Sequence, residues 1–157
     1  MEGGTLGRAL EREHHEIDAG IEGFGSEQLD ERERVQSLRR AIDALRRHIY
    51  LEEEFLFPPM EPELAIPTMV MLREHGEIWR SLDAIDAQLS EDTSGDALSQ
   101  ACSRLLLMLA GHNAKEEPIF YGRADEALSA DESAELEALI DSGRMPDGWT
   151  CRQASLG

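Results

Sequence analysis

Apolar residues recur every three or four positions along most of the chain, which is the spacing of one buried face on an α-helix. Four long segments show this pattern, at about residues 5–24, 30–57, 67–89 and 96–119. A fifth and shorter segment covers about residues 131–142. We find no stretch with the alternating pattern of a β-strand. The pattern therefore predicts an all-α protein.

Residues that begin or end helices separate these segments. Asp30 and Glu33 have the spacing of a capping box at the start of the second helix. Pro58 predicts the end of that helix, and Pro67 predicts the start of the third. Pro118 is expected to end or kink the fourth.

The connections between the long segments are short, and this favours antiparallel neighbours in an up-down-up-down four-helix bundle. The fifth segment predicts a short C-terminal helix packed on that bundle. We expect one bundle domain over residues 1–143 and an irregular tail over residues 144–157. No stretch is composed like a linker between domains.

Charge and cysteine content exclude several classes of protein. The chain has 33 Asp and Glu against 15 Lys and Arg, a net charge of −18, and no basic block, so we expect no nucleic-acid binding.

No apolar run is long enough to span a membrane, and the first residues do not resemble a signal peptide. Two cysteines are too few for a disulfide scaffold, which favours a cytoplasmic location. We expect Cys102 to be buried and Cys151 to be the more accessible thiol.

Side chains that bind metals continue the apolar stripes of the four long segments. They comprise four of the five histidines and two glutamates: His14, His48, Glu52, His75, His112 and Glu116. A buried carboxylate costs many kcal/mol unless it is paired or binds a metal, and no Lys or Arg lies on the stripes beside these two. The stripes therefore predict a buried metal site with nitrogen and oxygen ligands. His15 lies about 100° around the helix from His14 and is expected at the surface or in a supporting role.

The segments that carry these residues form an internal repeat. Residues 12–17, REHHEI, match residues 73–78, REHGEI, at an offset of 61. His48, Glu52 and Glu53 match His112, Glu116 and Glu117 at an offset of 64, and each segment ends near a phenylalanine, Phe57 or Phe120. The repeat predicts a pseudo-two-fold site for two metals, each half supplying two histidines and one glutamate. Glu53 and Glu117, which follow the two glutamates, are expected to face outward or to orient ligands.

These motifs resemble the hemerythrin-like HHE cation-binding family over about residues 5–142. The pattern H…HxxxE…H…HxxxE of that family is filled in order by the six residues named above. The resemblance implies a four-helix bundle that holds two non-haem iron ions, bridged by the two carboxylates and by an oxo or hydroxo group. The ligand types alone also suit manganese or zinc. A ferritin-like centre needs Glu-x-x-His pairs on two helices, and only Glu11 with His14 has this form.

The family also indicates what the ligand set can do. Oxygen-carrying hemerythrins have a fifth histidine one turn from the first on the third helix, but here Met71 and Trp79 occupy the positions one turn either side of His75. We expect both to pack against the centre. Asp18 is the best candidate for an extra ligand. Each iron would keep one position for water or substrate. Tyr121, like the other tyrosine, is expected to be a packing residue.

The sequence thus predicts a di-iron protein that reacts with O2, H2O2 or NO in oxidative or nitrosative stress, with peroxide turnover as the first activity to test. The alternative is a protein that binds, stores or senses O2, NO or iron without turnover. Iron–sulfur repair proteins resemble this bundle but typically carry an extra Cys-containing N-terminal domain. The closing residues Ala-Ser-Leu-Gly only hint at cargo of a protein shell. Small ligands are the expected partners, and the sequence predicts no oligomeric state.

Overall fold

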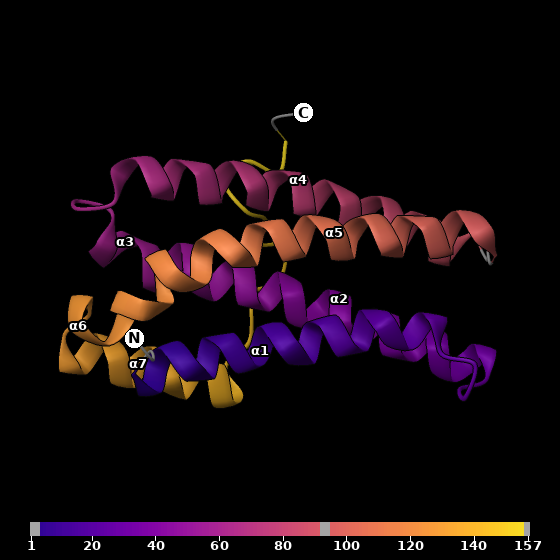
Figure 1. Cartoon of the computed structure of the whole chain (residues 1–157), viewed down its shortest axis with the longest axis horizontal. Helices are drawn as coiled ribbons and strands as arrows, with labels where there is room; N and C mark the ends of the chain where they lie inside the picture. Colours follow the sequence, from indigo (N-terminus) through magenta and orange to yellow (C-terminus); the bar gives the residue numbers. More distant parts are fainter. Residues whose placement is uncertain (1–3, 92–94, 156–157) are drawn as a thin grey trace.

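A computed structural model describes residues 4–91 and 95–155 and shows an all-α protein, as predicted. Figure 1 shows long helices lying side by side, with shorter ones gathered at one end. The long helices are α1 (Thr5–Glu22), α2 (Glu31–Leu51), α4 (Ala65–Ser90) and α5 (Asp96–Ile119). The shorter elements are η1 (Gly23–Gly25), η2 (Glu52–Leu56), α3 (Phe57–Met60), η3 (Tyr121–Arg123), α6 (Ala124–Ala127) and α7 (Ala130–Ser142).

Each long helix packs against two others. Helix α1 contacts α2 and α5, and α4 contacts α5 and α2. Helices α6 and α7 lie against α1 at the end of the molecule where the N-terminus is found (Figure 1). In the same view the tail after α7 runs past α2 towards α4. No helix in the described part of the chain is long and apolar enough to cross a membrane.

Most helix boundaries agree with the sequence, and the exceptions lie at prolines. The capping box of Asp30 and Glu33 is present. Helix α2 ends at Leu51, before the predicted end at Pro58, because the π-helical element η2 follows it, and Pro58 lies in the first turn of α3. Helix α4 begins before Pro67, because a proline in the first turn of a helix has no intrahelical N–H hydrogen bond to lose. Helix α5 ends just after Pro118. The short elements η3 and α6 have no apolar period and were not expected.

Two apolar clusters fill the space between the long helices. One contains Ile17, Ile42, Ile85 and Leu105, and the other contains Leu6, Leu10, Met71 and Phe120. On each long helix, the residues of one cluster precede those of the other along the chain. The predicted metal-binding residues lie where the two clusters meet, so apolar side chains surround them on both sides.

The tail beyond α7 is irregular but firmly packed. The Trp149 ring lies edge-on to Tyr50 and Trp79, at 5.2 and 5.6 Å between ring centroids. Cys151 is only 3 % exposed, so the expectation that it is the more accessible thiol was wrong. Burial raises the pKa of Cys151 to about 12 and that of Cys102, which is buried as expected, to about 11. The thiol of Cys151 in the tail is therefore as well buried as the thiol of Cys102 on α5.

Candidate metal centre

The structure brings all six predicted site residues together in the interior. His14 lies on α1, His48 on α2, Glu52 at the start of η2, and His75 on α4, while His112 and Glu116 lie on α5. None of the six is more than 4 % exposed. Four helices that lie far apart in the sequence thus present these side chains to one point, as the stripes predicted.

The six residues form two groups that share both glutamates. One group contains His14, His48, Glu52 and Glu116, and the other contains Glu52, His75, His112 and Glu116. Within each group one ligand atom per residue lies within 4.8 Å of the others. Each group could therefore hold one metal ion, with nitrogen and oxygen donors that suit iron, manganese or zinc.

Each shared glutamate presents one carboxylate oxygen to each group. Glu52 Oε2 lies 3.3 Å from His48 Nε2, while its Oε1 lies 3.2 Å from His75 Nε2. Glu116 Oε1 lies 3.2 Å from His14 Nε2, while its Oε2 lies 3.5 Å from His112 Nε2. Both carboxylates are thus oriented so that they can bridge two ions.

A π-helical turn begins at Glu52, which is one of the six residues of the site. In this turn the Phe57 N–H donates to the carbonyl of Glu52, five residues earlier, instead of four. Such turns bulge a helix locally and are frequent at functional sites. The corresponding segment of α5 remains α-helical through Glu116 and Pro118. The two halves of the repeat therefore reach similar ligand positions with different backbone geometry.

Every histidine of the site is held by a carboxylate on its outer ring nitrogen. The Nδ1 atoms of His14 and His112 each lie 2.9 Å from a carboxylate oxygen, and those of His48 and His75 lie 2.8 Å away. The four acceptors are Glu117, Glu13, Glu53 and Glu74, in the order of the histidines along the chain. Because a carboxylate only accepts, each Nδ1 carries the proton, and each Nε2 faces the centre.

These four carboxylates follow the internal repeat. Glu13 and Glu74 precede the first histidine of each half, and Glu53 and Glu117 follow the glutamate of each half. Glu53 and Glu117 therefore hold the imidazoles of His75 and His14, which fits one of the two roles expected for them. Glu13 and Glu74 were missed, although the Glu-His pair common to both halves of the repeat was a signal that could have found them.

Two charged side chains and one backbone N–H hold three of the four carboxylates in turn. Arg47 donates to Glu13 and also to the carbonyl oxygens at the end of α7. Lys115 pairs with Glu74. The backbone N–H of Arg152, in the tail, donates to Glu53. The tail therefore takes part in positioning a site residue.

Tyr121 lies inside the first group, so the expectation that it merely packs was wrong. Its Oη donates to Glu52 Oε2 at 2.5 Å and lies 3.0 Å from Glu116 Oε1. The same atom lies 2.8 Å from Nε2 of both His14 and His48. Burial, with the two carboxylates, raises the pKa of Tyr121 well above its usual value. The side chain follows the end of α5, where helical spacing no longer predicts its direction.

The remaining candidates belong to neither group of ligands. Asp18 has a buried Oδ1 without a hydrogen-bond partner among the described residues, and burial raises the pKa of Asp18. Met71 and Trp79 lie in the two apolar clusters. His15 is exposed. In this structure Met71 and Trp79 therefore line the interior as packing residues.

Protons balance the charges of the two buried carboxylates. Burial alone would lower the pKa of His48, but Glu52 and Glu13 outweigh it and raise that pKa to about 10. The pKa of His112 rises to about 10 against the same effect of burial, because of Glu116 and Glu74. Burial would raise the pKa of Glu116, yet His112 and His14 hold it well below its usual value. The cluster is thus a set of anions and cations whose protons a metal ion could displace.

Three ligand atoms have no hydrogen-bond partner among the described residues, although they are buried. They are Glu52 Oε1, His75 Nε2 and Glu116 Oε2, and all three belong to the second group. Buried polar atoms are normally satisfied, and a missing partner often marks a site for an ion. The residues present therefore fit a metal centre.

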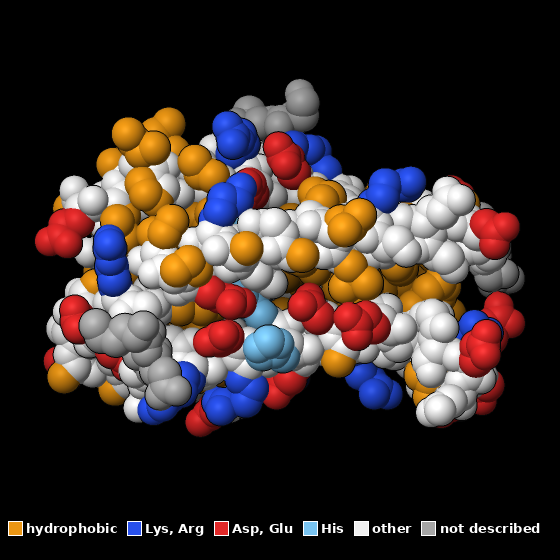
Figure 2. All heavy atoms as spheres, in the orientation of Figure 1, with side chains coloured by type: hydrophobic (Ala, Val, Ile, Leu, Met, Phe, Trp, Pro, Cys, Tyr) orange, Lys and Arg blue, Asp and Glu red, His pale blue; other side chains and the backbone are white. Residues whose placement is uncertain are grey.

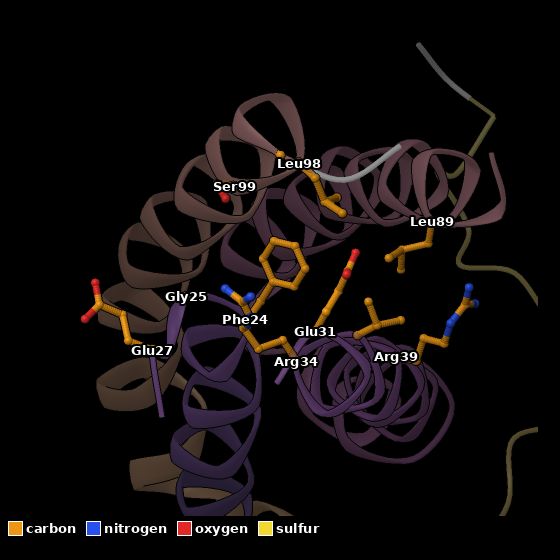
Figure 3. Close-up of a pocket in the computed structure, with 11 residues that line it drawn as sticks. Phe24, Gly25, Glu27, Glu31, Arg34, Arg39, Leu89, Leu98 and Ser99 are labelled. Carbon is orange, nitrogen blue, oxygen red and sulfur yellow. The ribbon is translucent and has the colours of Figure 1, made fainter. Parts of the chain in front are cut away.

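A small surface pocket between α4 and α5 reaches the second group. Its lining includes Glu74, Gly111, His112 and Lys115. A different pocket, shown in Figure 3, lies at the other end of the long helices and is lined by Phe24, Arg34 and Leu98 among others. It contains none of the six residues. Figure 2 shows acidic side chains gathered around histidine atoms on the face formed by α1 and α5.

Comparison with known proteins identifies the family of this chain. No curated protein and no solved structure gives a significant match. The family model of the hemerythrin HHE cation binding domain matches residues 5–124, which include all six residues and Tyr121. The chain belongs to the hemerythrin HHE cation-binding family.

Proposed function

We propose that the protein is a non-haem di-iron protein whose centre reacts with O2, peroxide or NO. One observation carries this proposal: two glutamates each offer one oxygen to two groups of imidazoles, in a buried cluster with unsatisfied ligand atoms. Two ions would satisfy these atoms, with His14 and His48 holding one and His75 and His112 holding the other. Iron is favoured over manganese and zinc by membership of the family, and the ligand types suit it.

The protein's own residues would bind, orient and shield this centre. Bound iron would supply the electrons for reduction of O2, peroxide or NO. Glu13, Glu53, Glu74 and Glu117 hold the Nδ1 protons, which keeps each Nε2 aimed inward. Apolar side chains of the two clusters exclude water on both sides. An oxo or hydroxo bridge would complete the proposed centre, as the resemblance to the family implies.

Reaction is favoured over simple oxygen carriage by the positions next to His75. Met71 and Trp79 lie one turn away on either side, and both are packed in the apolar clusters. Neither supplies a fifth imidazole. A vacant ligand position would let a small molecule bind directly, so we propose peroxide disproportionation or reduction as the first activity to test, in oxidative or nitrosative stress.

The arrangement of the long helices is the up-down-up-down bundle in our proposal. The packing of α1 on α2, α4 on α5, and the two pairs on each other supports this topology. We also propose a cytoplasmic location, which fits the free thiols of Cys102 and Cys151. Small ligands remain the proposed partners.

The experiment is a metal count followed by reaction. Protein purified from iron-replete cells should contain about two iron ions per chain, as its ligand groups imply. Its visible spectrum should then change on separate additions of O2, peroxide and NO, and oxygen evolution should report peroxide turnover. A protein that cannot be loaded with metal would contradict the proposal. A loaded protein with a stable oxy-form and no peroxide turnover would favour the alternative, which is binding or sensing without turnover.

A further inference from the structure

Tyr121 is the one phenol that reaches the candidate centre, and it does so in one half only. Its Oη lies 2.5 to 3.0 Å from the four ligand atoms of the first group. The ring is 2 % exposed and lies 5.0 Å from the imidazole of His14, measured between ring centroids. A side chain needed only for packing would place its hydroxyl away from two buried carboxylates, because burying so many polar groups together is costly.

The distances around Oη match those between neighbouring ligands of a single ion. Two donor atoms at right angles on an ion with bonds of about 2.1 Å are about 3.0 Å apart. His14 Nε2 and Glu116 Oε1 are 3.2 Å apart, and His48 Nε2 and Glu52 Oε2 are 3.3 Å apart. Oη lies at a similar distance from each of these atoms. It is therefore placed as a fifth donor atom beside the other four.

The internal repeat gives the second half a phenyl ring at the corresponding position. An offset of 64 residues, which relates His48 to His112, also relates Phe57 to Tyr121. Phe57 stacks on the imidazole of His75, with 5.6 Å between ring centroids. A phenyl ring offers no donor atom, so the second half lacks the ligand that Tyr121 could supply to the first.

We propose that Tyr121 Oη is a ligand of the ion held by His14 and His48, so that an added small ligand binds the ion held by His75 and His112. This assignment rests on the proposed two-metal function. The phenol proton is released to solvent when the ion binds. The two ions are then inequivalent: the first has its remaining position filled by the protein, and the second keeps a position for O2, peroxide, NO or a small anion such as azide.

The surface of the molecule agrees with this assignment. The pocket between α4 and α5 includes His112 in its lining, next to Gly111. The groove between α1 and α2 is lined by Arg47, the repeat counterpart of Gly111, and His48 is not among its lining residues. The second half thus has a pocket beside His112, and we expect a small ligand to approach the centre from this side.

The experiment uses a chain in which Tyr121 is the only tyrosine. The sequence has two tyrosines, so Tyr50→Phe, which keeps the ring packed on Trp149, provides this background. Loading with zinc should produce one tyrosinate per chain in the ultraviolet difference spectrum. Loading with ferric iron should produce a phenolate-to-iron charge-transfer band, with tyrosinate vibrations in the resonance Raman spectrum. Tyr121→Phe should abolish these signals, bind one of its two ions about tenfold more weakly, and keep its helical circular dichroism.

Metal counts separate the two proposals. If the Tyr50→Phe protein binds two ions and gives no tyrosinate signal, the assignment of Tyr121 is wrong and the proposed function stands. If it binds no ion, both are wrong. Phe57→Tyr offers a matched gain of function: it should add a second tyrosinate and weaken azide binding to the ferric protein. Unchanged azide binding in that variant, with a second tyrosinate present, would contradict the location of the open position.

Discussion

The two halves of the candidate centre each contain two histidines and share both glutamates, but they differ in the residues that surround them. In the half of His14 and His48, a tyrosine fills the interior, and Glu117, the carboxylate that holds His14, has a side chain that is 29 % exposed. In the half of His75 and His112, the interior position is a phenylalanine, and Glu53, the carboxylate that holds His75, is fully buried. The two halves of the repeat thus have the same set of histidines, glutamates and supporting carboxylates, but they differ in the aromatic residue beside them and in the burial of those carboxylates.

The C-terminal tail causes the difference at the outer carboxylates. A Cβ on Gly76 would lie 2.6 Å from the backbone oxygen of Gln153, so only glycine lets the tail pass over α4 here. At the corresponding position of the first half the chain has His15, which is exposed. With the tail in place, the Arg152 N–H reaches Glu53. Tyr121 therefore fills the interior of the half of His14 and His48, whereas the tail covers the outer carboxylate of the half of His75 and His112.

The largest expected effect is loss of metal from Glu116→Gln. Glu116 offers one oxygen to each half, and an amide cannot bridge two ions as a carboxylate does, so this change should prevent loading with two ions. His48→Ala and His112→Ala should each weaken mainly the ion of their own half. The measurement is metal content by elemental analysis after loading under identical conditions.

His15→Ala is the matched control for these changes. It removes an imidazole next to His14, but His15 is exposed and belongs to neither ligand group. The variant should load two ions like the unchanged protein. Loss of metal in His15→Ala, or full loading of Glu116→Gln, would contradict the assignment of ligands to the two halves.

The second prediction concerns pH, and here the two halves should behave alike. The pKa values of His48 and His112 rise from 6.5 to about 10 in the folded, metal-free protein. Each protonated histidine therefore stabilises the fold fully below about pH 6.5, and this contribution is lost as the pH rises through about 10. The free energy of unfolding of the metal-free protein should fall by several kcal/mol over this range, as measured by urea denaturation at each pH.

Two comparisons sharpen this pH prediction. His48→Gln and His112→Gln should each flatten the decline by a similar amount, because each removes one of the titrating groups. In the metal-loaded protein the ions replace the protons, so the difference in stability between loaded and metal-free protein should grow as the pH rises. A metal-free protein whose stability is constant from pH 6.5 to 10 would contradict the charge balance described for the site.

The third prediction tests the role of the tail. Glu53→Gln should lower the affinity for metal by about 10- to 100-fold, the usual effect of losing a carboxylate that orients a metal-binding histidine. Glu117→Gln should have a smaller effect, because water can replace a partly exposed carboxylate beside His14. Competition with a chelator measures both affinities. If both variants lose the same factor in metal affinity, burial of Glu53 under the tail does not strengthen its effect on His75.

The sequence predicted which side chains meet in the interior, because helical geometry decides their direction. His14 and His75 lie on apolar stripes, so their side chains had to enter the core. The same logic does not reach Tyr121, which lies after the end of α5, or Arg152, which lies in a tail without periodicity. The π-helical turn at Glu52 has no sequence signal that spacing could reveal. The direction of side chains within helices could thus be predicted from their spacing, whereas the contacts of chain ends and turns depend on tertiary packing.

The smallest expected effect concerns how a small ligand reaches the second half. Gly111 lines the pocket beside His112, and a Cβ added at this position would meet nothing within 4 Å. Gly111→Arg would therefore place a long side chain at the pocket without disturbing α5, and would imitate Arg47 of the first half. We expect azide to bind the ferric protein several-fold more slowly in stopped-flow measurements, with little change in metal content.

Ala110→Arg is the matched control, since it adds the same charge at an exposed neighbouring position that does not line the pocket. It separates obstruction of the pocket from electrostatic attraction of the anion, because the added charge acts in both variants while obstruction acts only in Gly111→Arg. Nitric oxide binding to the ferrous protein, which involves a neutral ligand, should be slowed in the same order. If the two arginine variants bind azide at the same rate, small ligands do not enter through this pocket, and the difference between the halves lies in their ligands alone.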